Sequence, residues 1–170
     1  LISGLEDVDW SESIKDIQKN WIGKSKGSSV IFNVDNSDEN IDVFTTRPDT
    51  IFGVNFIVLS PEHPLIDQLT IPSKKTDVVE YVSRAKLKSE RDRQADKSVS
   101  GVFTGSYAVH PFTGKKVAIW IGDYVLASYG TGAVMAVPCG DQRDWDFANH
   151  FNIEILNIFK DIDVSEKAYE

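Results

Sequence analysis

The chain is poor in the side chains on which covalent and metal chemistry most often depend. Its 170 residues include one cysteine, Cys139, and three histidines, His63, His110 and His150. A single cysteine excludes an internal disulfide and fits a reducing compartment. The histidines are scattered, and no two of them have the spacing of metal ligands. We therefore expect no metal site and no bound cofactor.

Long apolar runs and excess positive charge are also missing. No apolar run approaches the roughly 18–20 residues that a membrane-spanning helix needs, and no basic-then-apolar signal sequence opens the chain. The formal net charge is −8, whereas a domain that holds nucleic acid by its phosphates normally needs a basic face. We expect a soluble cytoplasmic protein, with an organelle as the other option, that does not contact membranes or bind long nucleic acid by itself.

Hydrophobic periodicity predicts an α+β fold. Residues 9–22 place Trp10, Ile14, Ile17 and Trp21 on one helical stripe. The other predicted elements are strands at 30–34, 41–46 and 51–59, a helix at 76–91, strands at 101–110, 115–121 and 129–137, a helix at 141–151 and a strand at 153–159. We expect a mostly antiparallel, barrel-like sheet with flanking helices.

A polar insert interrupts two apolar segments in VFTTRPDTIFG, residues 43–53. Its polar members are Thr45, Thr46, Arg47, Asp49 and Thr50. One interpretation is a turn in which Pro48 fixes φ and Asp49 bonds to the backbone. The other is a ligand site in which hydroxyls and amides surround a small polar group while Arg47 holds a phosphate or carboxylate. Local spacing leaves both open.

A second polar cluster follows a buried strand in PCGDQRDWDF. Asp141 and Asp144 stand three residues apart, so both carboxylates lie on one helical face, with Arg143 between them. They would complement the helix dipole, or they would overlook a pocket and bind an ammonium group. In YGTGAVM, the pair Gly130 and Gly132 is not a phosphate loop. These glycines allow another strand or a flat ligand to approach the backbone closely.

Five segments, taken in chain order, carry a family resemblance: VFTTRPDTIFG, SPEHPL, GVFTGSYAVHPFTG, IWIGDYVLASYGTGAVMAVP and DQRDWDFA. From about Leu5 to Phe159, the chain resembles the editing domain of leucyl-tRNA synthetase in its bacterial or organellar form. The resemblance implies the editing-domain fold that the class I valyl, isoleucyl and leucyl enzymes share. It divides the chain into a lead-in helix from the synthetase body at 1–22, the editing domain at 23–160 and an exit linker at 161–170.

The resemblance implies a function and partners. The expected reaction is post-transfer editing, the hydrolysis of the ester of tRNA(Leu) that carries norvaline, isoleucine or methionine, while leucyl-tRNA(Leu) is spared. The expected partners are the 3' end of tRNA(Leu) and the remainder of the synthetase, and the domain is expected to be a monomer. No HIGH-like or KMSKS-like stretch occurs, and the chain starts at Leu1 rather than Met, so we expect a fragment that cannot charge tRNA.

The resemblance also assigns roles to residues around the amino acid. Asp144, the aspartate that ends DQRD, would bind the α-amino group of the esterified amino acid through a charge-assisted contact. Thr50 would block the branched γ-position of leucine, because its β-branched side chain is stiff. The other residues predicted to bind the substrate on this side are Met135, Val137, Asp141 and Arg143.

The resemblance assigns further residues to the nucleotide end of the substrate. Thr45, Thr46 and Arg47 would contact the terminal adenosine and its phosphate or hold the attacking water, with Thr46 and Arg47 counted as catalytic beside Asp144. Leu126 and Tyr129 would flank the adenine. With no evident nucleophile and base, catalysis would depend on positioning water and substrate.

Two alternatives remain from the sequence. Family members commonly carry a histidine just before DQRD, whereas Gly140 follows Cys139 here, so any role of that histidine is not transferred to this chain. This departure keeps open a non-catalytic module of the same fold that binds tRNA ends or nucleotides. A thiol hydrolase that combines Cys139 with His110 and Asp141 is the other alternative, although a small buried cysteine is the simpler interpretation.

Overall fold

The computed structural model describes residues 1–23 and 26–169. Residues 24, 25 and 170, which fall within the predicted editing domain and exit linker, lie outside the described residues. The helices and strands are, in chain order, α1 Glu12–Ile22, β1 Ser28–Val34, β2 Asn40–Thr45, β3 Phe56–Leu59, α2 Ile66–Leu69, α3 Lys75–Ala85, α4 Glu90–Ala95, β4 Val102–Val109, β5 Lys116–Ile121, β6 Ala133–Ala136 and α5 Gln142–His150. Short 3-10 helices occupy Ser3–Leu5, Pro48–Gly53 and Pro72–Lys74.

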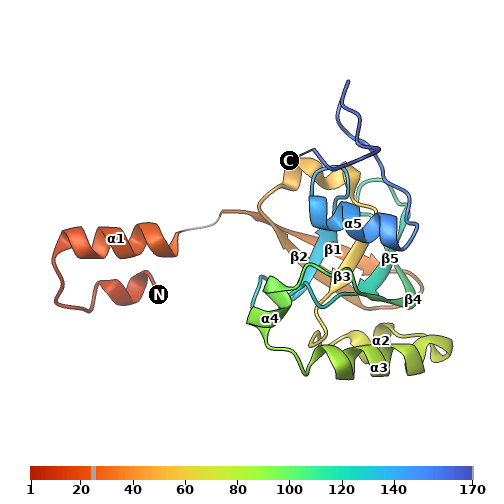
Figure 1. Ribbon diagram of the computed structural model, residues 1–170, viewed down its shortest axis with the longest axis horizontal. Helices are drawn as coiled ribbons and strands as arrows, with labels where there is room; N and C mark the ends of the chain where they lie inside the picture. The colour runs from red at the N-terminus through yellow and green to blue at the C-terminus, as the bar shows by residue number, and fades with distance from the viewer. Residues whose placement is uncertain (24–25, 170) are drawn as a thin grey trace.

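The strands form one mixed sheet in the order β2-β1-β4-β5-β3-β6. Among the described residues, four strand pairings are antiparallel and only β3 with β5 is parallel. The two edge strands approach one another, and the Thr131 hydroxyl, just before β6, donates to the carbonyl of Asp42 in β2. The sheet is therefore nearly closed (Figure 1), and the predicted α+β fold with a mostly antiparallel, barrel-like sheet is confirmed.

β3 is buried on both of its faces. Successive strand side chains point to opposite faces, so Ile57 and Leu59 join the core cluster that includes the barrel strands and α3, whereas Phe56 and Val58 join the cluster beneath α5. The ring of Phe147, from α5, stacks on Phe56 with the centroids 5.2 Å apart. α5 thus covers one side of the sheet, while α2 and α3 lie on the opposite side (Figure 1).

The predicted strand at 51–59 is wrong in its first half. Pro48 begins a 3-10 helix that runs to Gly53, and the strand starts only at Phe56. Two backbone hydrogen bonds close this helix, from the amide of Thr50 to the carbonyl of Arg47 and from the amide of Val54 to the carbonyl of Ile51. An apolar run does not distinguish a buried helix from a buried strand.

The predicted helix at 76–91 is two helices. α3 ends at Ala85, and α4 starts after Ser89 and runs past the predicted end at residue 91 to Ala95. The Ser89 hydroxyl accepts a hydrogen bond from the amide of Asp92 at 3.2 Å. A serine N-cap of this kind satisfies a free helical amide, so it stabilises a separate helix start.

The predicted strand at 153–159 is absent from the described structure. The amide of Ile153 bonds to the carbonyl of Ala148 at the end of α5, and the side-chain amide of Asn55 donates to the carbonyl of Glu154. The backbone groups of Ile153 and Glu154 therefore bond to α5 and to a side chain, and not to a neighbouring strand. The segment nevertheless packs on the core through partly buried residues such as Ile158.

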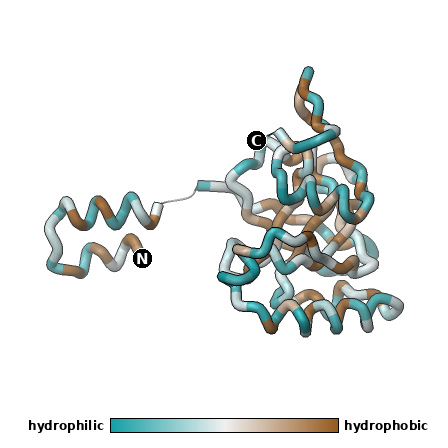
Figure 2. Tube along the Cα trace, viewed as in Figure 1, coloured by the Kyte–Doolittle hydropathy of each residue, from teal (hydrophilic) through white to brown (hydrophobic). Residues whose placement is uncertain are grey.

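α1 lies apart from the barrel, with apolar and polar residues alternating along it (Figure 1, Figure 2). The predicted stripe is solvent-exposed: Trp10 is 48% exposed, Ile14 46%, Ile17 64% and Trp21 87%. None of the described helices is long and apolar enough to cross a membrane.

The packing of α5 generates a test. Replacing Phe147 with Ala should lower the free energy of unfolding by about 3–5 kcal/mol, because this fully buried ring packs on Phe56 and Trp120 and its loss leaves a cavity. Urea denaturation followed by circular dichroism would measure the change. The control is Phe112→Ala, because Phe112 is 69% exposed. Equal losses in the two variants would contradict this packing.

Candidate functional site

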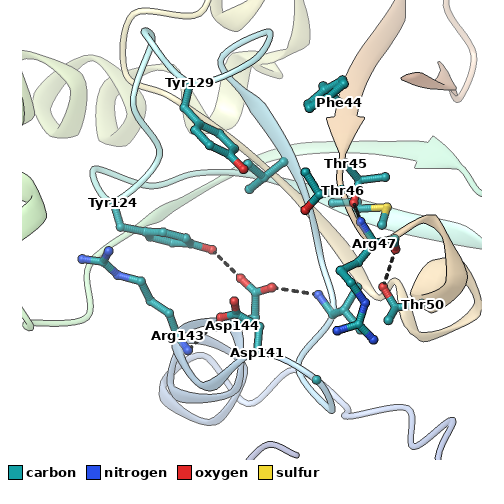
Figure 3. A pocket seen from close by; sticks show the side chains of 14 residues that line it. Phe44, Thr45, Thr46, Arg47, Thr50, Tyr124, Tyr129, Asp141, Arg143 and Asp144 are labelled. Atoms are coloured by element: carbon teal, nitrogen blue, oxygen red, sulfur yellow. Dashed lines mark hydrogen bonds between the residues drawn. The ribbon is translucent and has the colours of Figure 1, made fainter. Parts of the chain in front are cut away.

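A cavity of about 300 Å³ opens between the end of β2, the 3-10 helix Pro48–Gly53, β6 and the start of α5 (Figure 3). Its lining residues are Phe44, Thr45, Thr46, Arg47, Thr50, Tyr124, Tyr129, Val134, Met135, Val137, Gly140, Asp141, Arg143 and Asp144. The structure thus brings together around one cavity all the residues predicted from sequence for this site, with Leu126 the exception. Leu126 lines a neighbouring cavity of about 210 Å³, which shares Tyr124, Tyr129, Val134 and Arg143 with the first.

The turn after β2 fixes the side chain of Thr50. Its hydroxyl donates to the carbonyl of Arg47 at 2.9 Å, and its amide bonds to the same carbonyl at 3.2 Å. The Thr45 hydroxyl accepts from the amide of Arg47 at 3.0 Å. Thr50 is buried, so a β-branched side chain with one locked rotamer forms part of the cavity wall. The polar insert is therefore a hydrogen-bonded turn that borders a cavity, and its role as a ligand site stays a prediction.

The guanidinium of Arg47 is paired within its own turn. Its Nε lies 3.0 Å from Oδ1 of Asp49, and its Nη2 lies 2.9 Å from Oδ2. The hydrogen bonds raise the pKa of Arg47 and lower the pKa of Asp49. Both side chains are exposed, so the pair contributes little to stability. The Asp49 carboxylate therefore occupies the guanidinium group of Arg47, which the sequence analysis assigned to a phosphate or carboxylate of a ligand.

The two aspartates of DQRD have separate structural roles. Asp141 is the N-cap of α5, where its side chain accepts from the amides of Arg143 and Asp144 at 2.9 and 3.0 Å. Asp144 is buried in the first helical turn and accepts from the Val137 amide at 2.8 Å and from the Tyr124 hydroxyl at 3.0 Å (Figure 3). Asp141 thus caps the N-terminus of α5, whereas the carboxylate of Asp144 lines the cavity.

Burial changes the protonation of Asp144. Removal from water is the main reason that its pKa rises to about 7, and the neighbouring charge of Asp141 adds to the rise. The hydrogen bonds from Val137 and Tyr124 and the charge of Arg143 lower the pKa and oppose that rise. Strongly shifted carboxyl groups in cavities are candidates for functional residues.

Tyr124 is a site residue that the sequence did not reveal. Its hydroxyl reaches Asp144, and the guanidinium of Arg143 lies over its ring, 5.2 Å from the centroid. Burial and the charge of Asp144 raise the pKa of its phenol well above the usual value. Tyr124 lies in the segment IWIGDYVLASYGTGAVMAVP, but the segment does not indicate its role, because its partner Asp144 stands 20 residues later in the chain. Phe44 and Val134 also line the cavity, although the sequence assigned neither of them a role.

The loop before β6 explains the glycine pair. Gly130 and Gly132 both have positive φ, 57° and 74°, and this conformation strains residues with a Cβ. A Cβ on Gly132 would also stand 3.2 Å from the hydroxyl of Ser60. The tight turn leaves Tyr129 at the cavity wall, 55% exposed. The glycines therefore allow the left-handed backbone conformation of this turn.

Gly140, the residue just before DQRD at which the sequence departs from the pattern that the resemblance implies, lines the cavity. A Cβ built on Gly140 would lie 3.4 Å from the ring of Phe159. Met135 and Val137, the residues predicted to surround the amino acid, line the same cavity and are both buried.

The geometry does not assemble the alternative thiol triad. Cys139 is fully buried, and the carbonyl of the same residue accepts from the amide of Tyr169. The Nε2 of His110 donates to the carbonyl of Ile51, and its Nδ1 accepts from the amides of a turn, so both ring nitrogens are engaged. Within residues 1–23 and 26–169, no group of three His, Cys, Asp or Glu side chains is placed to hold a metal ion.

Comparisons with known proteins identify the family. The profile "Leucyl-tRNA synthetase, editing domain" matches residues 19–170. The leucine–tRNA ligase of Flavobacterium johnsoniae is 61% identical over 175 residues, and that of Christiangramia forsetii is 59% identical over 170 residues. Each match covers 99% of this chain and 18% of the relative.

A solved structure agrees. The crystal structure of the ternary complex of Agrobacterium radiobacter K84 agnB2 LeuRS-tRNA-LeuAMS has a TM-score of 0.79 and 34% sequence identity, covering 98% of this chain and 20% of that one. The chain belongs to the family of leucyl-tRNA synthetase editing domains. It spans about a fifth of the length of these relatives.

The raised pKa of Asp144 generates a test. A carboxyl pKa of about 7 in the folded state, against an ordinary value of 3.8, stabilises the fold below pH 4 and loses that stabilisation as the pH rises through 7. The free energy of unfolding of the wild type should therefore fall relative to Asp144→Asn between pH 4 and 7, by roughly 2–4 kcal/mol.

Urea denaturation across this pH range would measure the difference, since contributions from other groups cancel in the comparison. Asp146→Asn is the matched control, because Asp146 is an exposed aspartate of the same helix. Parallel pH curves for the wild type and Asp144→Asn would contradict the raised pKa.

Proposed function

We propose that this chain hydrolyses the ester of mischarged tRNA(Leu) that carries norvaline, isoleucine or methionine, and spares leucyl-tRNA(Leu). A binding pocket distinguishes one methylene by only about 1–3 kcal/mol, so close analogues of leucine are attached to tRNA at a low rate. A second site that excludes leucine and hydrolyses the others corrects these errors.

The observation that carries the proposal is the buried carboxylate of Asp144 on the cavity wall. An ammonium group is the natural ligand of such a carboxylate, because a charge-assisted contact offsets the desolvation of both groups. The α-amino group of an aminoacyl ester supplies this charge. Binding it would lower the pKa of Asp144 from about 7 and keep the carboxylate ionised at neutral pH.

Thr50 has the properties of a gate. It is buried beside the cavity, and its rotamer is locked by the hydrogen bond to Arg47. Leucine branches at its γ-carbon, whereas norvaline and methionine do not, so a rigid methyl-bearing side chain excludes leucine by steric conflict. Met135 and Val137 would line the rest of the amino-acid pocket.

The nucleotide end of the substrate would contact the turn after β2. The Thr46 hydroxyl makes none of the hydrogen bonds described for residues 1–23 and 26–169, and it is exposed at the cavity wall. It is therefore free to bind the attacking water or the terminal ribose. Arg47 would exchange Asp49 for the terminal phosphate, and Leu126 and Tyr129 would flank the adenine from the neighbouring cavity.

Hydrolysis of the ester requires a water molecule and a substrate held in the correct position relative to it. The oxygen of a water attacks the ester carbonyl carbon, the bond from that carbon to the ribose oxygen breaks, and the proton goes to the released ribose hydroxyl. Asp144 would fix the amino end and the Thr46–Arg47 turn the ribose end, so that the carbonyl stands beside the water. Positioning of this kind requires neither a protein nucleophile nor a metal.

The proposal includes the surroundings of the domain. The 3' end of tRNA(Leu) and the remainder of the synthetase are its partners, and the domain is a monomer in the cytoplasm. Residues 1–22 would lead in from the synthetase body, 23–160 form the editing domain and 161–170 lead out. Since the net charge is −8, affinity for the body of the tRNA would come from other parts of the synthetase.

The anchoring role has a direct test. Asp144→Ala should reduce deacylation of norvalyl-tRNA(Leu) by at least a hundredfold, since loss of a buried ion pair removes several kcal/mol of substrate binding. Release of labelled norvaline would be followed, with the uncatalysed rate subtracted. Asp146→Ala, an exposed aspartate one half-turn away, is the control. Wild-type rates in Asp144→Ala would exclude the anchor, and tRNA binding without hydrolysis in the wild type would favour a non-catalytic module.

The gating role has a separate test. Thr50→Ala should allow hydrolysis of leucyl-tRNA(Leu), because the side chain that blocks the γ-branch is lost. Thr50→Val is the matched variant: it keeps the branched shape and loses the hydroxyl, so it should still spare leucyl-tRNA(Leu). If Thr50→Ala leaves leucyl-tRNA(Leu) intact, Thr50 is not the gate.

A further inference from the structure

Tyr124 lies between the sheet and α5, in the loop that follows β5. Its hydroxyl is 3.0 Å from Oδ1 of Asp144, and it is the hydroxyl group that donates. The other carboxylate oxygen, Oδ2, accepts from the Val137 amide at 2.8 Å. Each oxygen of Asp144 therefore has one donor from a different segment of the chain, as Figure 3 shows.

Two donors on opposite oxygens fix the plane of the carboxylate. Rotation of the group about its Cβ–Cγ bond would break both hydrogen bonds at once. A carboxylate has about four lone-pair sites, so two remain for a ligand. The geometry leaves Asp144 oriented and still able to accept from an ammonium group in the cavity.

Tyr124 is itself held in place by its neighbours. The guanidinium of Arg143 covers its ring at 5.2 Å, and the ring of Phe147 lies 5.8 Å from it on the α5 side. Arg143 is held in turn, because its Nη2 donates to the carbonyl of Asp96 at 3.1 Å. A Cβ on Gly122 would approach the Tyr124 ring to 3.0 Å, so the backbone packs closely against it. The hydroxyl is thus presented to Asp144 by a packed ring.

The Tyr124 hydroxyl is one of several groups that act on the pKa of Asp144. Asp141, on the same helix, raises the pKa of Asp144, while Arg143 lowers it. The other ionisable groups on the cavity wall are Arg47, which is paired with Asp49, and Tyr129. The hydrogen bond from Tyr124 lowers the pKa of Asp144. Without this bond the pKa of Asp144 would be higher, so the carboxyl would stay protonated up to a higher pH. A neutral carboxyl pairs poorly with an ammonium group.

We infer that Tyr124 is a positioning residue for editing, which orients the Asp144 carboxylate and keeps it charged so that it can receive the α-amino group of the substrate. The inference rests on the proposed role of Asp144 as the anchor. Tyr124 acts through Asp144 and does not need to touch the reacting atoms.

The test is Tyr124→Phe, which keeps the ring and removes the donor. The acid limb of kcat/KM for norvalyl-tRNA(Leu), followed from pH 5.5 to 8.5, should shift upward by about half a unit to one unit, and one unit is a tenfold change in ionised carboxylate. Activity should fall about three- to tenfold at pH 6 and approach the wild type at pH 8.5. The amino group of the substrate titrates identically with both proteins, so it cancels.

A second measurement does not depend on turnover. The titration of the Asp144 carboxyl carbon, followed by carbon-13 NMR and assigned with Asp144→Asn, should shift to higher pH in Tyr124→Phe by the same amount as the kinetic limb. Tyr107→Phe is the control, because the Tyr107 hydroxyl is on β4 and makes no described hydrogen bond to Asp144. That variant should leave the titration and the pH profile unchanged.

The outcomes separate the two proposals. An unshifted carboxyl titration, or a shifted titration with an unchanged pH profile, overturns the role of Tyr124. A loss of activity equal at every pH, with an unshifted titration, also overturns it and reduces Tyr124 to packing. If Asp144→Ala retains full activity, the anchor itself fails, whatever Tyr124→Phe does. An inactive Asp144→Ala with an unaltered Tyr124→Phe leaves the anchor and removes only the positioning role.

Discussion

The rest of this site depends on the two hydrogen bonds that hold the buried carboxylate of Asp144. It lies in the first turn of α5, and its two hydrogen bonds come from Val137 at the end of β6 and from Tyr124 in the loop after β5. Three segments that are separate in the chain are therefore held at a fixed spacing. A carboxylate is expensive to bury unless donors compensate it, and here the compensation is incomplete, because burial still raises its pKa to about 7. A ligand that brings positive charge would complete it.

The sheet places this carboxylate opposite the threonine-rich turn. β3 is buried on both faces, so it can hold the barrel interior on one side and α5 on the other. Near-closure of the sheet brings β2 and β6, its two edges, beside one another. The turn that follows β2 and the helix that follows β6 then border one cavity. The site is thus a consequence of closure, because an open sheet would keep these two edges apart.

Several elements followed from local pattern, and others did not. The hydrophobic pattern of the sequence predicted β1, β2 and β5, and the family motifs predicted most of the residues that line the cavity. The strand expected from residue 51 begins only at Phe56, because hydrogen bonds to the carbonyl of Arg47 close a 3-10 turn first. The expected strand at 153–159 packs on the core without a ladder partner among the described residues. In both cases, apolar residues of the segment pack on the core, but the backbone does not form the predicted strand.

The sequence by itself determined most of the residues around the cavity, the fold class and the family, since these depend on residue types and their order. Only the tertiary structure decided how the residues divide their roles. It made Asp141 a helix cap and Asp144 a buried acceptor, it paired Arg47 with Asp49, and it brought Tyr124 to Asp144. The physical reason is that burial, hydrogen bonding and pKa depend on neighbours that are distant in the chain, and no local pattern of residues specifies those neighbours.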